Sequence, residues 1–194
     1  MGSGVDGLVS LFDAHGAIEY KGTGVSQLEH ALQAAEWAAT CGESPPGIMA
    51  ALCHNVGHLL GLAGHDLSGV DWLGGHRHAV AGADWLEREL GLEKSVTDLV
   101  RLQMAAIRYQ ARRVSGYAQD VLNAVEREAL ELEDGAMDLA EAEQFEAHPR
   151  HTEALRVRAY DCAGRVRGQR TWGLEEALEA AGHPSAAVPG SDRE

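Results

Sequence analysis

The chain has 194 residues, of which 45% are hydrophobic, and a formal net charge of −14. This length is enough for one domain with a sizeable core. The acidic balance excludes nucleic acid and anionic membrane surfaces as expected partners, because both bind clustered lysine and arginine. The sequence has three cysteines without ligand-like spacing, and it shows no recognisable secretory signal and no long apolar run. These features predict a cytoplasmic protein.

Helical periodicity dominates the sequence, and β-type alternation of any length is missing from it. The pattern predicts an all-α fold, with Ser26 and Glu29 forming a capping box at the start of the second helix. Residues 62–77 are rich in glycine and histidine and predict a long loop. We expect one helical domain over residues 1–182 and a flexible tail over 183–194. The predicted helices cover about 5–14, 26–41, 45–61, 78–90, 95–113, 117–133, 138–147, 150–167 and 174–181.

Ten histidines are many for this length, and four of them lie among apolar residues: His30, His54, His58 and His78. Any one of them alone is best interpreted as a hydrogen-bonded core residue. As a cluster they predict a functional site, because burying several imidazoles without partners is costly. Histidines and carboxylates on different helices of a bundle commonly converge on a metal. His15, His65, His148, His151 and His183 are interpreted as loop or surface residues.

The pair His54-Asn55 places a neutral amide where a metal site would have an aspartate. An adjacent His-Asp pair supplies a metal with one nitrogen ligand and one anionic oxygen ligand. Asn55 keeps the shape of aspartate and loses its charge. Asp161 lies further along the chain, in a basic helical segment with Arg158.

Several segments together resemble the HD-domain superfamily, and within it the mixed-valence di-iron oxygenases that cleave hydroxyalkylphosphonates, a group related to inositol oxygenase. The resemblance covers residues 20–165. It implies a single-domain HD-type helical bundle that encloses a metal site. The segments that carry it are Gln27-Leu-Glu-His30-Ala-Leu32, His54-Asn55-Val-Gly-His58, His78 before Gly82-Ala83, Arg101-Leu-Gln103, Asp134-Gly135-Ala-Met137 and Asp161.

The resemblance also implies which residues correspond to the two irons of such oxygenases. The first iron would be held at His30, His54, Asn55 and Asp161. The second would be held at Asn55, His78 and Gln103. Tyr20 matches a tyrosine that covers the site in the family, and Arg158 and His58 match residues of its anion pocket.

The sequence departs from this pattern at the positions that hold the second iron and the phosphonate. Asn55 cannot be an anionic bridge, and Gln103 replaces an imidazole. Ile107 replaces a phosphonate-binding lysine, and Glu126 and Ala129 replace two hydroxyl residues. Thr23 stands where an acidic residue is expected.

These departures predict at most one metal ion, ferrous or another divalent ion, held by His30, His54 and Asp161, with His78 as a further candidate. A di-iron centre is not expected. The predicted partner is a small organic substrate that is not a phosphonate, in contact with Arg158, Gln103 and Asn55. His58, Tyr20 and Glu126 are the predicted catalytic residues.

The sequence leaves two alternatives to an oxygenase-like enzyme. One is a metal-independent acid/base enzyme, such as an isomerase, lyase or cyclase, that uses the same cavity. The other is a pseudoenzyme that binds a small ligand without catalysis.

Overall fold

Helices make up the regular structure of the chain in this computed structural model, which describes residues 5–20, 22–64 and 75–183. Within those ranges strand-like pairing is limited to one isolated bridge between Glu19 and Ser26. The predicted all-α class is therefore confirmed. Most of the predicted tail over 183–194 lies outside the described residues, and the domain boundary stays a prediction.

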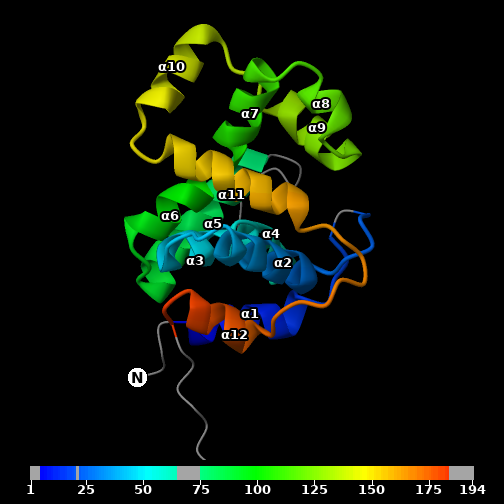
Figure 1. The fold of residues 1–194 in the computed structure, drawn as a ribbon, viewed down its shortest axis with the longest axis vertical. Helices are drawn as coiled ribbons and strands as arrows, with labels where there is room; N and C mark the ends of the chain where they lie inside the picture. The colour runs from blue at the N-terminus through cyan, green and yellow to red at the C-terminus, as the bar shows by residue number, and fades with distance from the viewer. Residues whose placement is uncertain (1–4, 21, 65–74, 184–194) are drawn as a thin grey trace, which may run out of the picture.

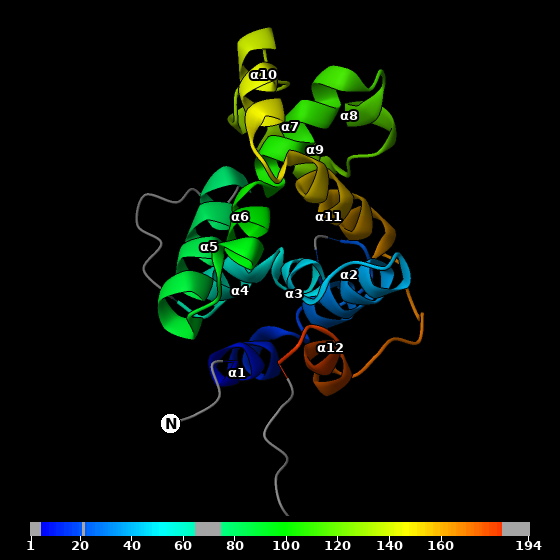
Figure 2. The same ribbon diagram turned by 60° about the vertical axis from the view of Figure 1, so that its left-hand side comes forward.

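The helices stack in layers around α11, which crosses the middle of the molecule (Figure 1). α11 packs on α2 and α3 on one side and on α7 on the other, while α4 and α6 pack on α5. The α7–α10 region lies on the far side of α11 from α1 and α12 (Figure 2). The bounds are α1 Asp6–His15, α2 Gln27–Thr40, α3 Pro45–Cys53, α4 Val56–Leu62, α5 Gly75–Leu90, α6 Lys94–Arg101, α7 Gln103–Arg113, α8 Tyr117–Asp120, α9 Ala124–Leu132, α10 Leu139–Ala147, α11 His151–Ala163 and α12 Leu174–Ala180.

The start of α2 follows the predicted capping box. The Ser26 hydroxyl accepts a hydrogen bond from the backbone N–H of Glu29 at 3.1 Å, and Glu29 accepts one from the backbone N–H of Ser26 at 2.7 Å. This reciprocal pair satisfies N–H groups that have no partner inside the helix. It fixes the register of α2, which carries His30 into the core.

Three predicted helices are each divided in two. The predicted 45–61 helix ends at Cys53 and resumes at Val56, so His54 and Asn55 occupy the junction of α3 and α4. Asn55 has φ −111° and ψ 14°, outside the helical range, and its side chain makes no capping hydrogen bond there. Similar breaks separate α6 from α7 at Leu102 and α8 from α9 at 121–123. The His54 break turns two polar side chains inward at a helix end.

Two glycines let α4 and α5 cross very closely. A Cβ atom added to Gly57 would overlap the carbonyl oxygen of His78. One added to Gly82 would lie 2.9 Å from the backbone nitrogen of Gly57. The crossing therefore excludes side chains at both positions and brings the start of α5 against α4.

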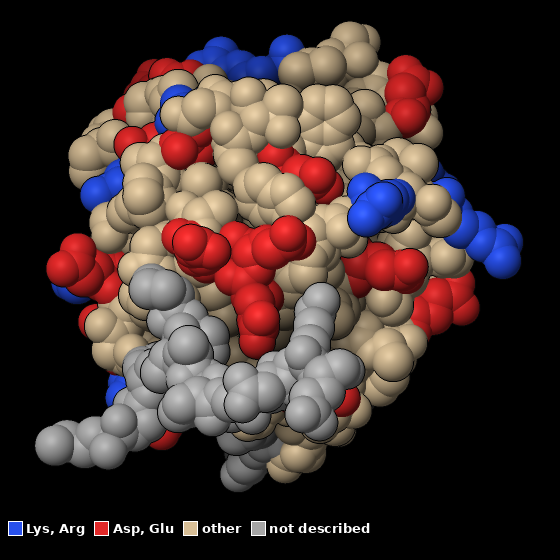
Figure 3. Space-filling model, turned by 60° about the horizontal axis from the view of Figure 1, so that its bottom comes forward, with Lys and Arg blue, Asp and Glu red and all other residues tan. Residues whose placement is uncertain are grey.

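The outer face at the end of the molecule formed by α1 and α12 carries a group of acidic side chains (Figure 3). Aspartates and glutamates gather in the middle of this face, and basic side chains lie toward its edges (Figure 3). The net charge of −14 is thus visible as a surface feature as well as a sum. Among the described helices, none has the length and apolar character needed to cross a bilayer.

Candidate functional site

Three buried side chains from three separate segments meet at one point. The Nε2 atoms of His30 and His54 are 3.0 Å apart. The Asp161 Oδ1 atom lies 3.2 Å from His30 Nε2 and 3.6 Å from His54 Nε2. All three residues are at most 4% exposed. Within the described ranges this is the group of histidine, cysteine and carboxylate side chains whose geometry could hold a metal ion.

The hydrogen bonds behind the two imidazoles decide which ring atoms face the meeting point. His30 Nδ1 lies 2.6 Å from the Gly164 carbonyl oxygen, and His54 Nδ1 lies 2.7 Å from the Ala51 carbonyl oxygen. A carbonyl only accepts, so each Nδ1 carries the proton and donates it. Both Nε2 atoms then present lone pairs toward each other and toward a carboxylate. Three acceptors converging this way require a cation between them.

Protonation of an imidazole is a poor way to supply that cation. Burial disfavours the charged ring and, together with the facing His54, outweighs the attraction of Asp161, so the pKa of His30 is lowered. Ligand atoms about 2.1 Å from one ion lie about 3.0 to 3.4 Å apart in octahedral or tetrahedral sites. The two shorter distances at the site, 3.0 and 3.2 Å, fall in this range. The donor set therefore fits a divalent metal ion.

A buried network of two arginines and two carboxylates holds Asp161 in its ionised form. Arg158 donates to Asp161, and Arg165 Nη2 donates to Asp161 Oδ1 at 2.8 Å. Arg158 and Arg165 also bind Glu126, at 2.8 Å from Nη1 of Arg158 and 2.9 Å from Nη1 of Arg165. Burial by itself would raise the pKa of Asp161, but the two arginines outweigh it and the pKa lies well below its usual value.

Tyr20 packs on one face of His30. Its ring stacks on the His30 imidazole, with centroids 4.0 Å apart and planes within 11°. The Arg165 guanidinium lies 5.9 Å from the centroid of the Tyr20 ring. Tyr20 is 1% exposed, and burial raises the pKa of its phenol, so the hydroxyl stays protonated. The ring fixes the orientation of His30 and keeps water from it.

A cavity of about 40 Å³ is lined by His54 and Asp161, two of the three converging side chains. The imidazoles of His58 and His78 also line it, with their centroids 4.5 Å apart. The side-chain amides of Asn55 and Gln103 also line it, and each has a buried NH₂ nitrogen without a hydrogen-bond partner. The complete lining is Tyr20, His54, Asn55, Gly57, His58, His78, Ala79, Gln103, Met104, Ile107, Glu126, Ala129 and Asp161.

Comparison with known proteins gives two relatives whose names state an activity. Hydroxymethylphosphonate dioxygenase of Gimesia maris is 35% identical over 179 residues, which cover 90% of this chain and 85% of the relative. [1-Hydroxy-2-(trimethylamino)ethyl]phosphonate dioxygenase (glycine-betaine-forming) of Leisingera caerulea is 33% identical over 84% of this chain and 81% of the relative. This chain belongs to the phosphonate dioxygenase family. No family model matches it.

A third relative is uncharacterized. The uncharacterized protein L432 of Acanthamoeba polyphaga mimivirus is 29% identical over 81% of this chain and 70% of its own length. Membership of the dioxygenase family supports an oxidoreductase-like enzyme with a small-molecule substrate. The buried His30, His54 and Asp161 add a group that could bind the metal of such an enzyme.

Within this member of the family, the structure places most of the predicted site residues together. His30, His54 and Asp161 converge, while Asn55, His58, His78 and Gln103 line the adjoining cavity. His78 lies against His58 and outside the converging group. The sequence interpretation put His58 on the same helical face as His54, but the break at 54–55 places the two histidines on different segments.

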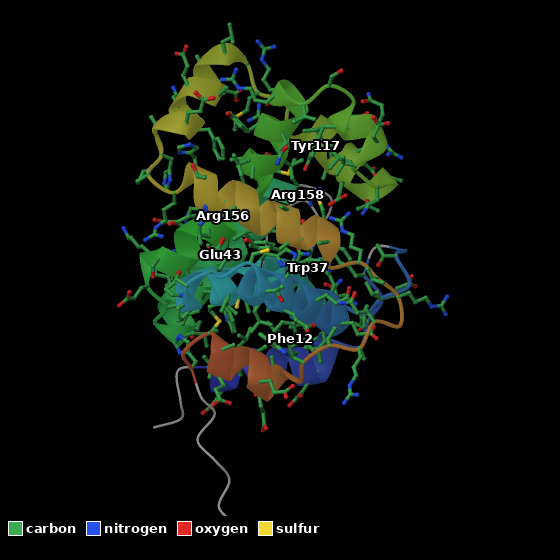
Figure 4. All side chains as sticks on the ribbon, in the orientation of Figure 1. Phe12, Trp37, Glu43, Tyr117, Arg156 and Arg158 are labelled. Atoms are coloured by element: carbon green, nitrogen blue, oxygen red, sulfur yellow. The ribbon has the colours of Figure 1, made fainter. Side chains whose placement is uncertain are left out.

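Arg158 lies behind the cavity wall. It is fully buried and donates to the Tyr117 hydroxyl at 2.9 Å as well as to Glu126 and Asp161, and Figure 4 shows it close to Tyr117 where α8 faces α11. It is not among the residues that line the cavity. Its predicted contact with a substrate stays a prediction.

Two members of the buried network escaped the sequence interpretation, namely Tyr117 and Arg165. Arg165 lies four residues after Asp161, a spacing at which side chains meet on a helix, so a charge pair could have been predicted there. Tyr117 has no comparable signal, because it meets Arg158 across 41 residues of chain.

Proposed function

We propose that this protein is an oxygenase-like enzyme with one divalent metal ion, acting on a small organic molecule that is not a phosphonate. The observation that carries the proposal is the convergence of two imidazole lone pairs and one carboxylate oxygen in a buried site. His30, His54 and Asp161 would hold the ion. Two histidines and one carboxylate are the ligands of mononuclear iron sites that leave positions open for substrate and oxygen.

The chain's own residues would prepare this site. Arg158 and Arg165 keep Asp161 ionised, and the backbone carbonyls of Gly164 and Ala51 keep both imidazoles turned with Nε2 inward. A ferrous ion held there would supply the redox chemistry and the Lewis acidity. His58, which lines the cavity, is our candidate for moving a proton to or from the substrate.

Glu126 supports a role as a fixed charge. Burial raises the pKa of its carboxyl, but Arg158 and Arg165 outweigh that effect and the pKa is lowered. Its Oε2 atom also accepts from the backbone N–H of Asn123 at 3.0 Å. A carboxylate that is kept ionised by several hydrogen bonds is a poor proton donor or acceptor. It contributes a fixed negative charge beside the cavity instead. We therefore propose an electrostatic role for Glu126, and the catalytic role predicted from the sequence stays a prediction.

The charge of the lining argues against a phosphonate substrate. No lysine or arginine is among the described lining residues, whereas the carboxylates of Glu126 and Asp161 are. Ile107 and Ala129 contribute apolar surface where an anion would need donors. A phosphonate would therefore find no cationic side chain on this wall to bind its oxygens.

Metal loading tests the first part of the proposal. Protein loaded anaerobically with Fe²⁺ and then desalted should retain about one iron per chain by elemental analysis. His54→Ala should retain only traces, and His15→Ala, at the end of α1, should retain as much as the natural chain. Trace metal in the natural chain would contradict the proposal and favour the metal-independent enzyme or the pseudoenzyme.

Oxygen uptake tests the second part. The iron-loaded enzyme should not consume oxygen with hydroxymethylphosphonate, but should do so with a member of a panel of small neutral, amine-bearing and carboxylated compounds. Turnover of the phosphonate would overturn this choice of substrate class. Activity that survives complete chelation would point to the metal-independent alternative.

A further inference from the structure

Two buried amide groups of the cavity have hydrogen-bond donors without partners. Gln103 is 7% exposed, and its Nε2 atom has no hydrogen-bond partner. The Nδ2 atom of Asn55 is also buried without one. Unpaired buried donors destabilise a folded chain, and native proteins contain few of them. Two that line the same cavity indicate that an acceptor from outside the chain completes them.

We propose that Asn55 and Gln103 form a binding site for the carboxylate group of a small ligand. A carboxylate has two acceptor oxygens and no donor, so each amide NH₂ can serve a different oxygen. An ammonium group would instead oppose donors to donors. The amide donors would thus orient a carboxylated substrate beside the proposed metal ligands.

Charge favours an anionic ligand. Asp161 and Glu126 are balanced by Arg158 and Arg165 through the contacts of the buried network. The wall adds no cationic side chain of its own among the described residues. A divalent ion at the three converging ligands would leave its positive charge uncompensated, and this charge would attract an anion. The two NH₂ groups match the two oxygens of a carboxylate, whereas the third oxygen of a phosphonate would have no amide donor.

Volume limits the ligand to a few atoms. The cavity of about 40 Å³ accommodates about three water-sized groups. A two-carbon or three-carbon acid is therefore the size class that the cavity admits. This inference rests on the proposed function only where it places the carboxylate beside a metal ion. The two amide donors are part of the chain and do not depend on that proposal.

The test is the binding of acetate and glycolate to the natural chain and to variants without the donors. Gln103→Met and Asn55→Leu keep approximate volume and remove the NH₂ groups. Titration followed by NMR, with and without Zn²⁺ as a redox-inert metal, should show saturable binding to the natural chain. Each variant should bind at least about tenfold more weakly. Methylphosphonate and ethylammonium should bind more weakly than acetate.

Stability of the ligand-free protein gives a second readout. Gln103→Met should raise the melting temperature, because it removes an unpaired buried donor, whereas loss of a structural hydrogen bond would lower it. Thr97→Val is the matched control. Thr97 is 0% exposed with an unpaired hydroxyl on α6 and does not line the cavity, so this change should raise the melting temperature and leave acetate binding unchanged.

The outcomes separate this inference from the proposed function. If acetate and glycolate do not bind, or bind the Gln103→Met and Asn55→Leu variants as tightly as the natural chain, the carboxylate site is refuted even where one metal per chain is retained. If no metal is retained but acetate binding depends on Gln103, the carboxylate site stands and the metal enzyme does not.

Discussion

The two walls of the cavity differ in the kind of polar atom they present. On the acceptor wall, His54 and Asp161 line the cavity and converge with His30, and the outer sides of these groups are hydrogen-bonded. On the donor wall, formed by Asn55 and Gln103, the NH₂ groups have no partner. Acceptors without donors call for a cation, and donors without acceptors call for an anion or a carbonyl. The polar groups of the cavity therefore change from acceptors on one wall to donors on the other.

The largest effect should follow from removing the carboxylate of the acceptor wall. Asp161→Ala would eliminate a metal ligand and leave Arg158 and Arg165 with fewer partners. Because an uncompensated buried charge costs about 3 to 5 kcal/mol, we expect unfolding to become easier by that amount, with metal affinity lowered more than about a hundredfold.

Denaturant titration and metal-binding titration measure the two effects of Asp161→Ala. Glu89→Gln, on the exposed side of α5, is the control and should change neither. Unchanged metal affinity in Asp161→Ala would remove the distinction between the two walls, since the acceptor wall would then have no metal to hold.

The next largest effect concerns the charge balance behind the cavity. Glu126→Ala would leave Asp161 as the carboxylate that Arg158 and Arg165 still share, and we expect a loss of about 3 kcal/mol in unfolding free energy. Added formate should fill the vacated space and recover part of the loss, measured as a formate-dependent rise in melting temperature. A variant that is as stable as the natural chain, and whose melting temperature does not change with formate, would show that Glu126 does not balance the charge of the arginines.

A smaller effect on stability, with a change in metal content, should follow from altering the donor wall. The double variant Asn55→Asp, Gln103→His exchanges the amides for ligand groups beside His78. We expect metal content by elemental analysis to rise from about one to about two per chain, and the metal-free protein to lose about 1 to 2 kcal/mol. Two metals in the natural chain, or one in the variant, would break the comparison.

The smallest effect on stability should come from a residue outside the cavity, Glu43. Glu43 accepts from Arg156 and from the Tyr160 hydroxyl at 2.9 Å, and the Arg156 hydrogen bond lowers the pKa of Glu43 below its ordinary 4.5. Figure 4 shows Glu43 and Arg156 near the junction of α2, α3 and α11.

Because the folded state lowers this pKa, the stability that Glu43 contributes is present above pH 4.5 and is lost as pH falls through the lowered value. Glu43→Gln should cost less than about 1 kcal/mol at neutral pH and should reduce the acid dependence. Denaturant titrations at pH 7 and pH 4 measure the free energy of unfolding of the variant and of the natural chain. Any change in metal or acetate binding would show that the cavity is coupled to this surface.

Sequence reasoning reached the helices and the acceptor wall but stopped at features that depend on distant contacts. The apolar period around His30 and the capping box at Ser26 are local signals, so both were predictable. The break at His54 and Asn55 was not, since the neighbouring residues are apolar and continue a helical pattern. The network through Arg165 and Tyr117 depends on segments that meet only in the folded chain.

The close crossing at Gly57 and Gly82 has a consequence for how this cavity can diversify. Since no side chain fits between α4 and α5, the two helices are held at a fixed, close distance beneath His58 and His78. Changes of ligand would then come more readily from exchanging side chains of the lining than from moving these helices. In the proposed site, Asn55 and Gln103 would be such exchanges, because they change the hydrogen-bonding groups of the cavity without changing its backbone.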